Sequence, residues 1–566
     1  MRFPRLSMLV GALAFLADHI GFATPPGCTT RHPSNDASSV TKFVKDKICD
    51  QIQLCSYLAY LISKTFVYCG ATACGRGAAV DTEPRQEQET MPAIRGIEVH
   101  SIDWIPERER HGKLWHQAPL WFLGNFQYFT IPIGFIGPAM GLSLWWTALA
   151  GLLGIVVGTF FMAFHGSQGP KLGLPQMIQS RAQFGYRGVV IVLFVALFTY
   201  MAFNVTDQVL LAQGISGAYG WNPTAIALVT VIAAALLAIF GHDWVHRIFR
   251  ILLVISFPLV TIITIAIITG HAGGFAPKTH YGFKLTAFMA EFSAAAAYNI
   301  TYAPYVSDYS RYLPSRTKSR SVIFSVFFGA SSSAIWLIAL GAWLAIHLSA
   351  NDGLLGLKTA GNNVFGGLGS VAALTSALAL LATMGMNAYG ASLTLLTGID
   401  CFKKVNPTRA ARIVSILGLA IVWYLIGDMI TTSAVNTVFT ALTLMLYLLV
   451  PWTATNLIDF FYVRRGHYAI TDLFSLDGIY HRWNWRGITA YAIGFAAEIP
   501  FMVLPQLGSL SYIGPVAKLL NDTDISWLVG LVVTAIAYLL ITRGFDPKTE
   551  EQAIAKSEAT LKADFG

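Results

Sequence analysis

Polar side chains inside long apolar runs are the residues of this sequence that could do chemistry. Tyr200 and Asn204 stand four residues apart in FTYMAFNVTDQ, so they share one face of a helix. Asn387 lies in ATMGMNAYGAS, and Tyr298 and Asn299 follow a run of alanines. An amide in such surroundings is costly without a polar partner. That partner is either a neighbouring helix or a bound solute, and we expect a solute.

The stretch from Glu291 to Pro314, EFSAAAAYNITYAPYVSDYSRYLP, begins as an apolar helix and ends in a charged cluster. Small residues, an amide, hydroxyls and Pro304 interrupt it. Unwound backbone at membrane depth is tolerated only where it is buried in protein or lines a cavity. We therefore expect a helix that is broken at a solute site.

The composition places the chain among helical membrane proteins. Of its 566 residues 55% are hydrophobic and only 12% are charged, and the mean hydropathy is +0.56. The net charge of +8 does not indicate nucleic-acid binding, because the charges lie between apolar runs and no basic soluble domain is visible.

The cysteines and histidines do not predict a metal site or a cofactor. Only Cys401 of the six cysteines lies in the apolar body, which excludes a disulfide framework or a cysteine metal site there. His242 and His246 have i, i+4 spacing in GHDWVHR, but two ligands are too few, so we expect a structural role for them.

Residues 1–95 differ from the rest. The run MLVGALAFLA has the length of a signal-peptide core, yet IEVHSIDWIPERERHG starts soon after Met91. We interpret 1–95 as an atypical extension that does not belong to the mature protein, with Met91 as the favoured start and a cleaved signal as the alternative. Residues 96–117 are then an N-terminal segment, 118–545 the apolar domain and 546–566 a C-terminal tail.

Apolar windows of about 20 residues recur from Ala118 onward. They predict about 12 membrane-spanning helices, near 118–141, 144–165, 188–213, 222–241, 250–270, 285–306, 321–349, 368–397, 410–430, 432–456, 487–506 and 525–543.

The basic residues between these spans predict the orientation. With a cytoplasmic start, the inner connections hold 17 lysines and arginines and the outer ones hold Lys278, Lys284, Lys358 and Lys518. An excess of Lys and Arg marks the cytoplasmic side. Both termini are therefore expected in the cytoplasm and the chain in the cell (plasma or inner) membrane.

The first and sixth spans are richest in helix breakers; the first contains Pro119, Gly124, Pro132, Gly134, Gly137 and Pro138. Interrupted segments at corresponding places in two halves of a chain indicate the midplane site of a secondary transporter. Gly and Pro are also common in ordinary membrane helices, which is the competing interpretation.

Four stretches resemble the nucleobase-cation-symport-1 family, and in particular its purine-cytosine permease branch. They are SIDWIPERERHG, GLPQMIQSRAQFGYRG, TYAPYVSDYSRYLP and LIDFFYVRRGHYAITDLF, and the likeness runs in the expected order from about residue 98 to 545. The resemblance implies an all-α polytopic membrane protein of the leucine-transporter type, with a 5+5 inverted repeat followed by two further helices. It also implies import of a nucleobase or a related ring compound, driven by protons or sodium.

The resemblance implies which residues bind the substrate. Family members place an aromatic and an amide at the positions of Tyr200 and Asn204 and again near Tyr298 and Asn299, often with Trp where this chain has Tyr. Gln127 matches a position that contacts substrate in relatives, and Asn387 of the eighth span completes the predicted set. Aromatic faces suit stacking on a base, and amides suit its polar edge.

Sodium-coupled relatives use backbone carbonyls and two side-chain hydroxyls, and the resemblance carries these onto Leu123, Phe126 and Ala382, and onto Gly385 and Met386. Because Gly385 and Met386 have no side-chain oxygen, the sequence favours proton coupling over sodium. A proton carrier needs an ionisable group inside the membrane. The candidates for coupling or gating are Glu291, Asp308, Glu498 and Asp207.

The sequence thus predicts a symporter that imports a nucleobase, cytosine or purine-like, together with protons. Sodium coupling, another ring substrate (allantoin, hydantoin or a vitamin) and a membrane sensor that binds without transport remain alternatives. No nucleophile and base, and no metal constellation, indicates an enzyme. The predicted partners are the small-molecule nucleobase and the lipid bilayer, with no nucleic acid and no protein partner.

Overall fold

The computed structural model describes residues 103–275, 281–405, 408–507 and 510–565. The predicted extension 1–95, residues 96–102 and Lys278 lie outside these ranges, and so do the side chains of His242 and His246.

Eight helices in the described ranges are long and apolar enough to cross a membrane, and each overlaps one predicted span. Local signals explain their ends: Pro223 begins one of them, and the Asn222 side chain caps it by accepting from the backbone N–H groups of Thr224 and Ala225. The eight are α6 (Leu144–Gly166), α10 (Val190–Tyr219), α11 (Pro223–Phe240), α12 (His242–Ile268), α15 (Ser319–His347), α17 (Leu368–Asp400), α18 (Arg409–Met429) and α19 (Ala434–Ile458).

The other four predicted spans are broken or short. The first is divided into α3 (Gln117–Asn125), α4 (Thr130–Ile133) and α5 (Ile136–Ala139), and the sixth into α13 (Leu285–Ile300) and α14 (Ala303–Ser310). The interruptions predicted in both segments are therefore present. The last two predicted spans contain α20 (Trp485–Glu498) and α22 (Ser526–Ile541).

The prediction of a continuous helix over 487–506 is wrong. Helix α20 gives way at Glu498 to the short 3₁₀ helix η5 (Ile499–Phe501), and strand β1 (Val503–Leu507) pairs antiparallel with β2 (Leu510–Ile513). Pro500 explains the change, because proline has no N–H to continue the helix.

Short elements complete the described chain. At the end of the bundle that holds α23 lie η1 (Glu107–Glu109), α7 (Gln168–Leu172), α8 (Gln176–Gln179), α9 (Arg181–Phe184), the π-helix η3 (Asp459–Val463), η4 (Ile470–Phe474), η6 (Pro547–Glu550) and α23 (Glu551–Phe565). The remaining short elements are η2 (Leu114–His116), α16 (Gly353–Val364) and α21 (Pro515–Leu519). Helix α16 lies in a connection for which no helix is predicted.

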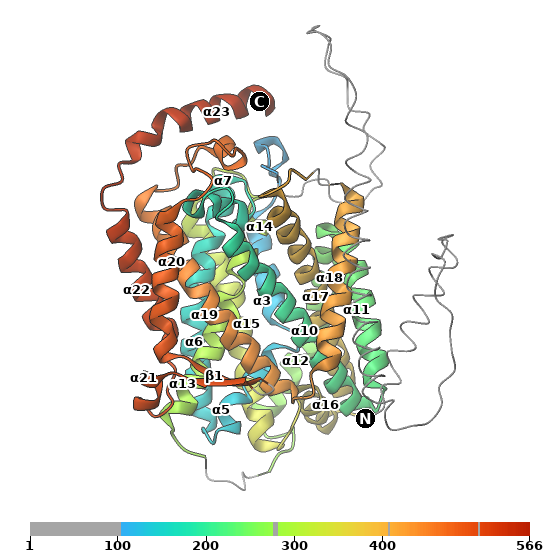
Figure 1. Ribbon diagram of the computed structural model, residues 1–566. Coiled ribbons are helices and arrows are strands. Elements are labelled where there is room, and N and C mark those ends of the chain that lie inside the picture. The colour runs from blue at the N-terminus through green and yellow to red at the C-terminus, as the bar shows by residue number, and fades with distance from the viewer. Residues whose placement is uncertain (1–102, 276–280, 406–407, 508–509, 566) are drawn as a thin grey trace, which may run out of the picture. The chain divides into compact units, whose positions relative to one another are not determined.

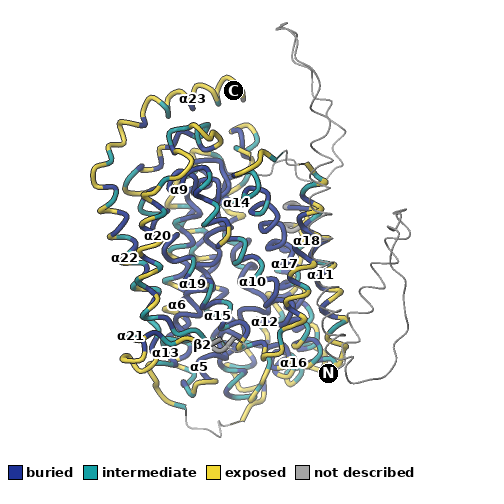
Figure 2. The backbone as a smooth tube through the Cα atoms, in the orientation of Figure 1, coloured by how far each residue is buried: buried dark blue, intermediate teal, exposed yellow. Residues whose placement is uncertain are grey.

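Two groups of helices pack around the broken segments. Helices α3, α6, α13 and α15 contact one another on one side, and α10, α11, α17 and α18 on the other. Helix α10 also packs on α19. Helices α20 and α22 pair at the edge opposite α11 and α18, as Figure 1 shows. The buried residues concentrate in the central helices (Figure 2).

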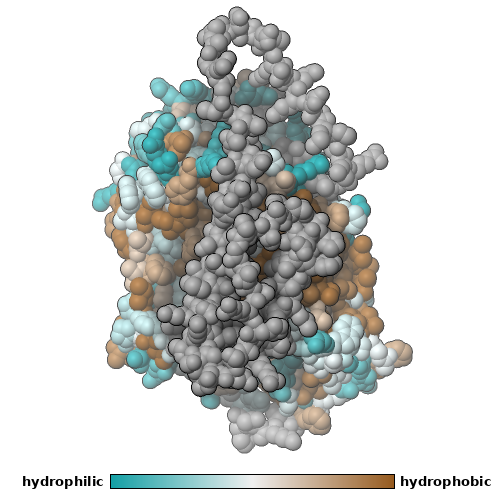
Figure 3. All heavy atoms as spheres, turned by 45° about the vertical axis from the view of Figure 1, so that its right-hand side comes forward, coloured by the Kyte–Doolittle hydropathy of each residue, from teal (hydrophilic) through white to brown (hydrophobic). Residues whose placement is uncertain are grey.

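The outer surface carries an apolar belt. Val254, Ile268 and Leu540 are each more than 60% exposed, as are other large apolar residues of the outer helices. Figure 3 shows hydrophobic side chains across the middle of the unit and hydrophilic ones toward its two ends. An exposed apolar surface of this extent is expected where lipid covers the protein.

Candidate functional site

The two breaks lie side by side, and hydroxyls from both of them pair backbone carbonyls at the end of α3. The Tyr302 hydroxyl, from the break between α13 and α14, donates to the carbonyl of Gly124 at 3.1 Å. The Thr130 hydroxyl spans the first break and donates to the carbonyl of Asn125 at 2.5 Å. Carbonyls freed by unwinding are thus paired within the protein, which backbone at membrane depth requires.

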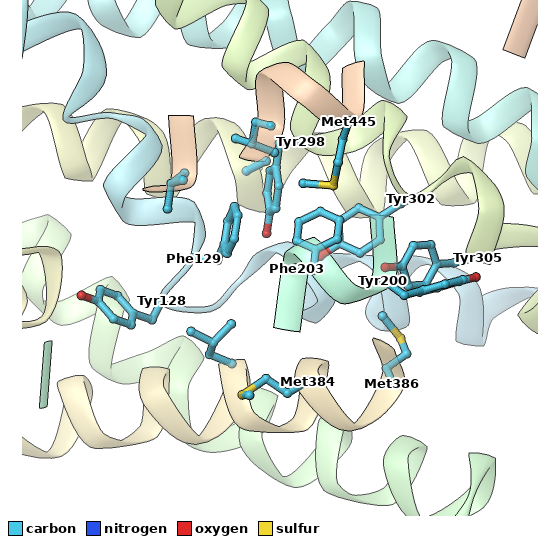
Figure 4. Close-up of a cluster of buried hydrophobic side chains, with 14 of the residues drawn as sticks. Tyr128, Phe129, Tyr200, Phe203, Tyr298, Tyr302, Tyr305, Met384, Met386 and Met445 are labelled. Atoms are coloured by element: carbon cyan, nitrogen blue, oxygen red, sulfur yellow. The ribbon is translucent and has the colours of Figure 1, made fainter. Parts of the chain in front are cut away.

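Aromatic rings from three segments form a row beside the breaks (Figure 4). Phe129 and Tyr298 stack with centroids 5.3 Å apart and planes 8° apart. Phe203 of α10 stacks on Tyr302 at 5.9 Å and 18°, and Phe129 and Phe203 meet edge to face at 5.3 Å. The row offers flat apolar faces of the kind that a planar ring compound can stack on.

Tyr200 ends this row. Its ring lies edge to face on Tyr305, with centroids 4.3 Å apart, and its hydroxyl donates to the carbonyl of Pro304 at 3.4 Å. Gly390 of α17 makes room for the ring, since a Cβ atom there would lie 2.6 Å from a Tyr200 ring carbon. The position of Tyr200 therefore depends on a missing side chain in the facing helix.

Two of the predicted substrate residues meet directly. The Gln127 amide donates to the Tyr298 hydroxyl at 2.9 Å, while its carbonyl accepts from the Phe129 N–H at 2.6 Å. The Thr130 hydroxyl is also within hydrogen-bond distance of the Tyr298 hydroxyl, at 2.8 Å. Both ends of the Gln127 amide are therefore engaged, and the side chain orients Tyr298.

Asn299, also predicted to bind substrate, is hydrogen-bonded to side chains of α3 and α6. Its carbonyl accepts from the Asn125 amide at 2.7 Å, and its own amide donates to the Thr159 hydroxyl at 2.5 Å. The Asn125 amide donates further to the carbonyl of Ala330 at 2.8 Å. The structure thus places Asn299 in a polar junction of α3, α6, α13 and α15.

Asn204, Asp207 and Asn387 form a buried polar group where α10 packs on α17. Each is at most 1% exposed, and the Asn387 amide donates to Asp207 Oδ2 at 3.3 Å. Neither polar atom of Asn204 has a partner among the described residues, and the same holds for Asp207 Oδ1 and Asn387 Oδ1. Buried polar groups are rarely left unpaired in folded proteins. These atoms are donors and acceptors that water or a polar solute can pair with.

The other three predicted coupling residues have different surroundings. Glu291 accepts from the Gly137 N–H through Oε2 at 2.9 Å. Asp308 accepts from the Gln176 N–H, which opens α8, at 2.9 Å, and lies in electrostatic range of Tyr200 and Tyr305. Glu498 packs between α20 and α22 against Gly530, away from the aromatic row.

Tyr128, in the first break, turns away from the aromatic row (Figure 4). Its hydroxyl donates to Asp352, which caps α16 by accepting from the N–H groups of Leu354 and Leu355. Burial raises the pKa of Asp352, and the Tyr128 hydrogen bond opposes that rise. This contact joins the first break to α16.

The positions that the resemblance assigns to sodium hydroxyls have no oxygen to offer. Gly385 of α17 faces α11, where a Cβ atom would lie 2.9 Å from the Leu237 side chain. Its neighbour Met386 is a buried thioether side chain. A hard cation prefers oxygen ligands, so these two residues are poor candidates for binding sodium.

A chain of buried amides lies at the α23 end. The Gln168 amide donates to Asn456 at 2.8 Å, and the Asn456 amide donates to Gln183 at 3.3 Å. The Gln183 amide donates in turn to the Asp459 carboxylate at 2.7 Å. The chain connects the segment between α6 and α10 with the end of α19.

Arg464 links that carboxylate to the C-terminal segment. Its guanidinium lies 2.5 Å from Asp459 and 3.0 Å from Glu550 of η6. Burial lowers the pKa of Arg464, but the two carboxylates raise it well above its usual value. The arginine therefore stays charged and fastens η6 to the bundle.

The site contains residues that sequence reasoning missed: Phe129, Thr130, Phe203, Tyr302 and Tyr305. One signal was available, because Tyr298, Tyr302 and Tyr305 repeat at intervals of four and three residues and so lie along one helical face. Phe129 carries no such signal, because it lies within a break.

Residues 104–530 match a family described as "Permease for cytosine/purines, uracil, thiamine, allantoin". The chain is 35% identical over 463 residues, covering 81% of it and 98% of the relative, to the Bacillus subtilis (strain 168) protein "Putative purine-cytosine permease YxlA". It is 23% identical over 495 residues, covering 81% of it and 91% of the relative, to the purine-cytosine permease fcyB of Emericella nidulans.

A solved structure shares the fold. The closed conformation of Mhp1, a nucleobase-cation-symport-1 family transporter with bromovinylhydantoin bound, superposes with a TM-score of 0.62 at 17% identity. The match covers 81% of this chain and 98% of that one. The resemblance drawn from the four sequence stretches is confirmed, and so is the prediction of a permease rather than an enzyme.

Proposed function

Because the chain belongs to the permease family for cytosine/purines, uracil, thiamine and allantoin, we propose that it is a secondary active symporter that imports a nucleobase. The favoured substrate is cytosine or a purine-like base, the coupling ion is the proton, and transport proceeds by alternating access.

This proposal is carried by one observation: the aromatic row lies next to the buried polar group of Asn204, Asp207 and Asn387. Phe203 and Asn204 are adjacent on α10, and Phe203 contacts both Phe129 and Tyr302. A nucleobase has a flat face for stacking and an edge that needs hydrogen bonds. Asn204 supplies an unpaired donor and acceptor for that edge, and Asn387 supplies an unpaired acceptor. We propose that these two amides contact the base, that Tyr200 and Tyr298 bound its face, and that Gln127 holds Tyr298.

The proposal assigns Asn299 to a supporting role. Both of its polar groups are already paired with Asn125 and Thr159. An amide that is fully satisfied by the protein gains little from a solute, since it would have to exchange one bond for another. Asn299 then stabilises the broken helix next to the base.

We propose that the spans have the leucine-transporter type of arrangement. In it, two inverted repeats of five helices each are followed by two further helices, and both termini lie in the cytoplasm. The support is the pair of broken segments, α3 to α5 and α13 to α14, which begin the two sets. The excess of Lys and Arg in alternate connections supports the orientation and the cell membrane as location.

Proton coupling is supported by two features. Gly385 and Met386 lack the hydroxyls that the sodium-coupled pattern requires. A carboxyl group, in contrast, lies deep among the spans next to the proposed base-binding amides: Asp207 is 1% exposed. A carboxyl group that gains and loses a proton as access alternates would couple the proton gradient to transport.

The test is uptake of radiolabelled cytosine into proteoliposomes that contain the purified full-length protein. An inward proton gradient should drive accumulation, and replacing sodium by choline should leave it unchanged. Competition by unlabelled adenine, uracil, allantoin and hydantoin would rank the ring substrates. Binding without accumulation would show a sensor instead, and accumulation only with a sodium gradient would contradict proton coupling.

A further inference from the structure

Asp207 and Asn387 form one hydrogen-bonded pair with two free oxygens. The Asn387 amide donates to Asp207 Oδ2 at 3.3 Å, which leaves Oδ1 of each side chain without a partner among the described residues. Asp207 lies one helical turn from Asn204, whose amide is also unpaired. The free oxygens therefore belong to the same group as the proposed base-binding amide.

The surroundings of Asp207 contain hydroxyls but no cation. Tyr298, Tyr302 and Tyr305 of the broken helix lie in electrostatic range of its carboxyl group. No Lys, Arg or His of the described residues forms an ion pair with it, and α17, α19, α11, α16 and α18, which pack on α10, bring no other charged group to it. A buried carboxylate without a cation is unfavourable in a closed site.

We propose that Asp207 carries the coupling proton, and that this proton changes which hydrogen-bond donors and acceptors of the protein face the substrate. With the proton on Oδ1, the pair presents a donor from Asp207 beside an acceptor from Asn387. Without it, the pair presents two acceptors, and one of them is charged. This inference rests on the proposed nucleobase transport and assigns its ion coupling to one side chain.

The donor and acceptor that the Asp207–Asn387 pair presents define the class of substrate. A donor beside an acceptor complements a ring that presents an acceptor next to an N–H, which is the edge of an amidine or a lactam. Such a base would bind only after Asp207 is protonated, because two acceptors would face its own acceptor and leave it unpaired. The proton enters with the base from the outside and leaves for the cytoplasm when the opened site is hydrated and the carboxylate becomes stable again.

The other buried carboxyl groups do not meet this description. Glu291 contacts the backbone of Gly137 next to α5, and Glu498 packs on Gly530 between α20 and α22. Neither is hydrogen-bonded to a side chain that we assign to the base. Glu291 and Glu498 can therefore serve as matched controls.

The experiment compares the wild type with Asp207→Asn in the full-length protein. Asparagine has the shape of the protonated acid and keeps a donor beside an acceptor, but it carries no proton to release. Radiolabelled cytosine binding and exchange across the vesicle membrane are measured from pH 5.5 to 8.5, and a dye inside the vesicles reports proton entry on addition of unlabelled cytosine. Glu291→Gln and Glu498→Gln are measured alongside.

The wild type should bind cytosine more weakly as the pH rises, by up to tenfold per pH unit above the apparent midpoint, and should admit protons with the base. Asp207→Asn should bind and exchange cytosine with less than a threefold change over the range, and should admit no protons. The glutamate variants should behave like the wild type. If Asp207→Asn still couples proton entry to cytosine, or folds and binds no cytosine, the proposal is wrong.

Two further outcomes separate this inference from the proposed function. If the wild type neither binds nor exchanges any base, the proposed function itself fails. If Asp207→Asn does not fold, Asp207→Glu replaces it, and this variant must retain proton entry with the base. A folded Asp207→Glu protein that transports cytosine without protons would overturn the proposal.

Discussion

The amide of Gln127 donates to the hydroxyl of Tyr298 at 2.9 Å and so ties the break after α3 to the end of α13. We predict that Tyr298→Phe keeps the stack on Phe129 but lowers the apparent affinity for cytosine about three- to tenfold. The loss corresponds to about 0.5–1.5 kcal/mol for one hydrogen bond. Tyr298→Ala removes the stack as well and should be more severe. Equal uptake in the wild type and Tyr298→Phe would exclude a role for the hydroxyl.

We predict that alanine substitutions at Asn204 and Asn299 have opposite effects: the first weakens base binding and the second lowers stability. Asn204→Ala leaves no protein group unpaired, so the protein should remain as stable as the wild type, yet bind the base roughly ten- to a hundredfold more weakly. Asn299→Ala removes one hydrogen bond each from Asn125 and Thr159, which keep their bonds to Ala330 and Ile155, and at about 0.5–1.5 kcal/mol for each lost bond it should lower the melting temperature. Melting curves and cytosine binding on the purified variants check both. Near-normal binding by Asn204→Ala would remove Asn204 from the site.

Gly390 and Gly398 lie on the same helix and make a matched pair. A Cβ atom on Gly390 would lie 2.6 Å from the Tyr200 ring, whereas a Cβ atom on Gly398 would meet nothing within 4 Å. Gly390→Ala should therefore displace Tyr200 and reduce cytosine uptake severalfold, while Gly398→Ala should leave uptake unchanged. Both proteins should reach the membrane in wild-type amounts. If uptake falls equally in both variants, the effect belongs to the helix and not to the ring.

Arg464 and Arg482 contrast a buried ion pair with an exposed one. Arg464→Ala leaves Asp459 and Glu550 without their cation and should destabilise the protein by about 3–5 kcal/mol. Arg482 pairs with Asp477 in solvent, with side chains 56% and 84% exposed, so Arg482→Ala should cost less than about 1 kcal/mol. Thermal unfolding in detergent measures both. We also expect faster proteolysis of the segment around η6 in Arg464→Ala, because the arginine fastens it.

Much of the architecture follows from the sequence because apolar length and helix breakers act locally. Runs of about 20 apolar residues predict the long helices. Gly124, Pro132 and Pro304 lie in or next to the segments that are in fact broken. The hairpin of β1 and β2 was missed, since the apolar residues after Pro500 suit a strand as well as a helix.

The site could be predicted only in part, because the direction of a side chain is decided by packing. Tyr298 and Asn299 are neighbours, yet Tyr298 joins the aromatic row and Asn299 turns to Thr159 of α6. Asp207 and Asn387 are separated by 180 residues, and no local pattern pairs them. Their position within apolar runs identified each of these polar residues in the sequence. Only the folded chain shows which of them are hydrogen-bonded within the protein and which are not.

Proton-coupled nucleobase transport is tested by the accumulation of radiolabelled cytosine in proteoliposomes under an imposed inward proton gradient, without sodium. We predict that cytosine accumulates above its external concentration, that this accumulation collapses when a protonophore removes the gradient, and that Asn204→Ala reduces it at least tenfold. A wild-type protein that reaches only the external concentration with and without the gradient, in sodium or in choline, would contradict it.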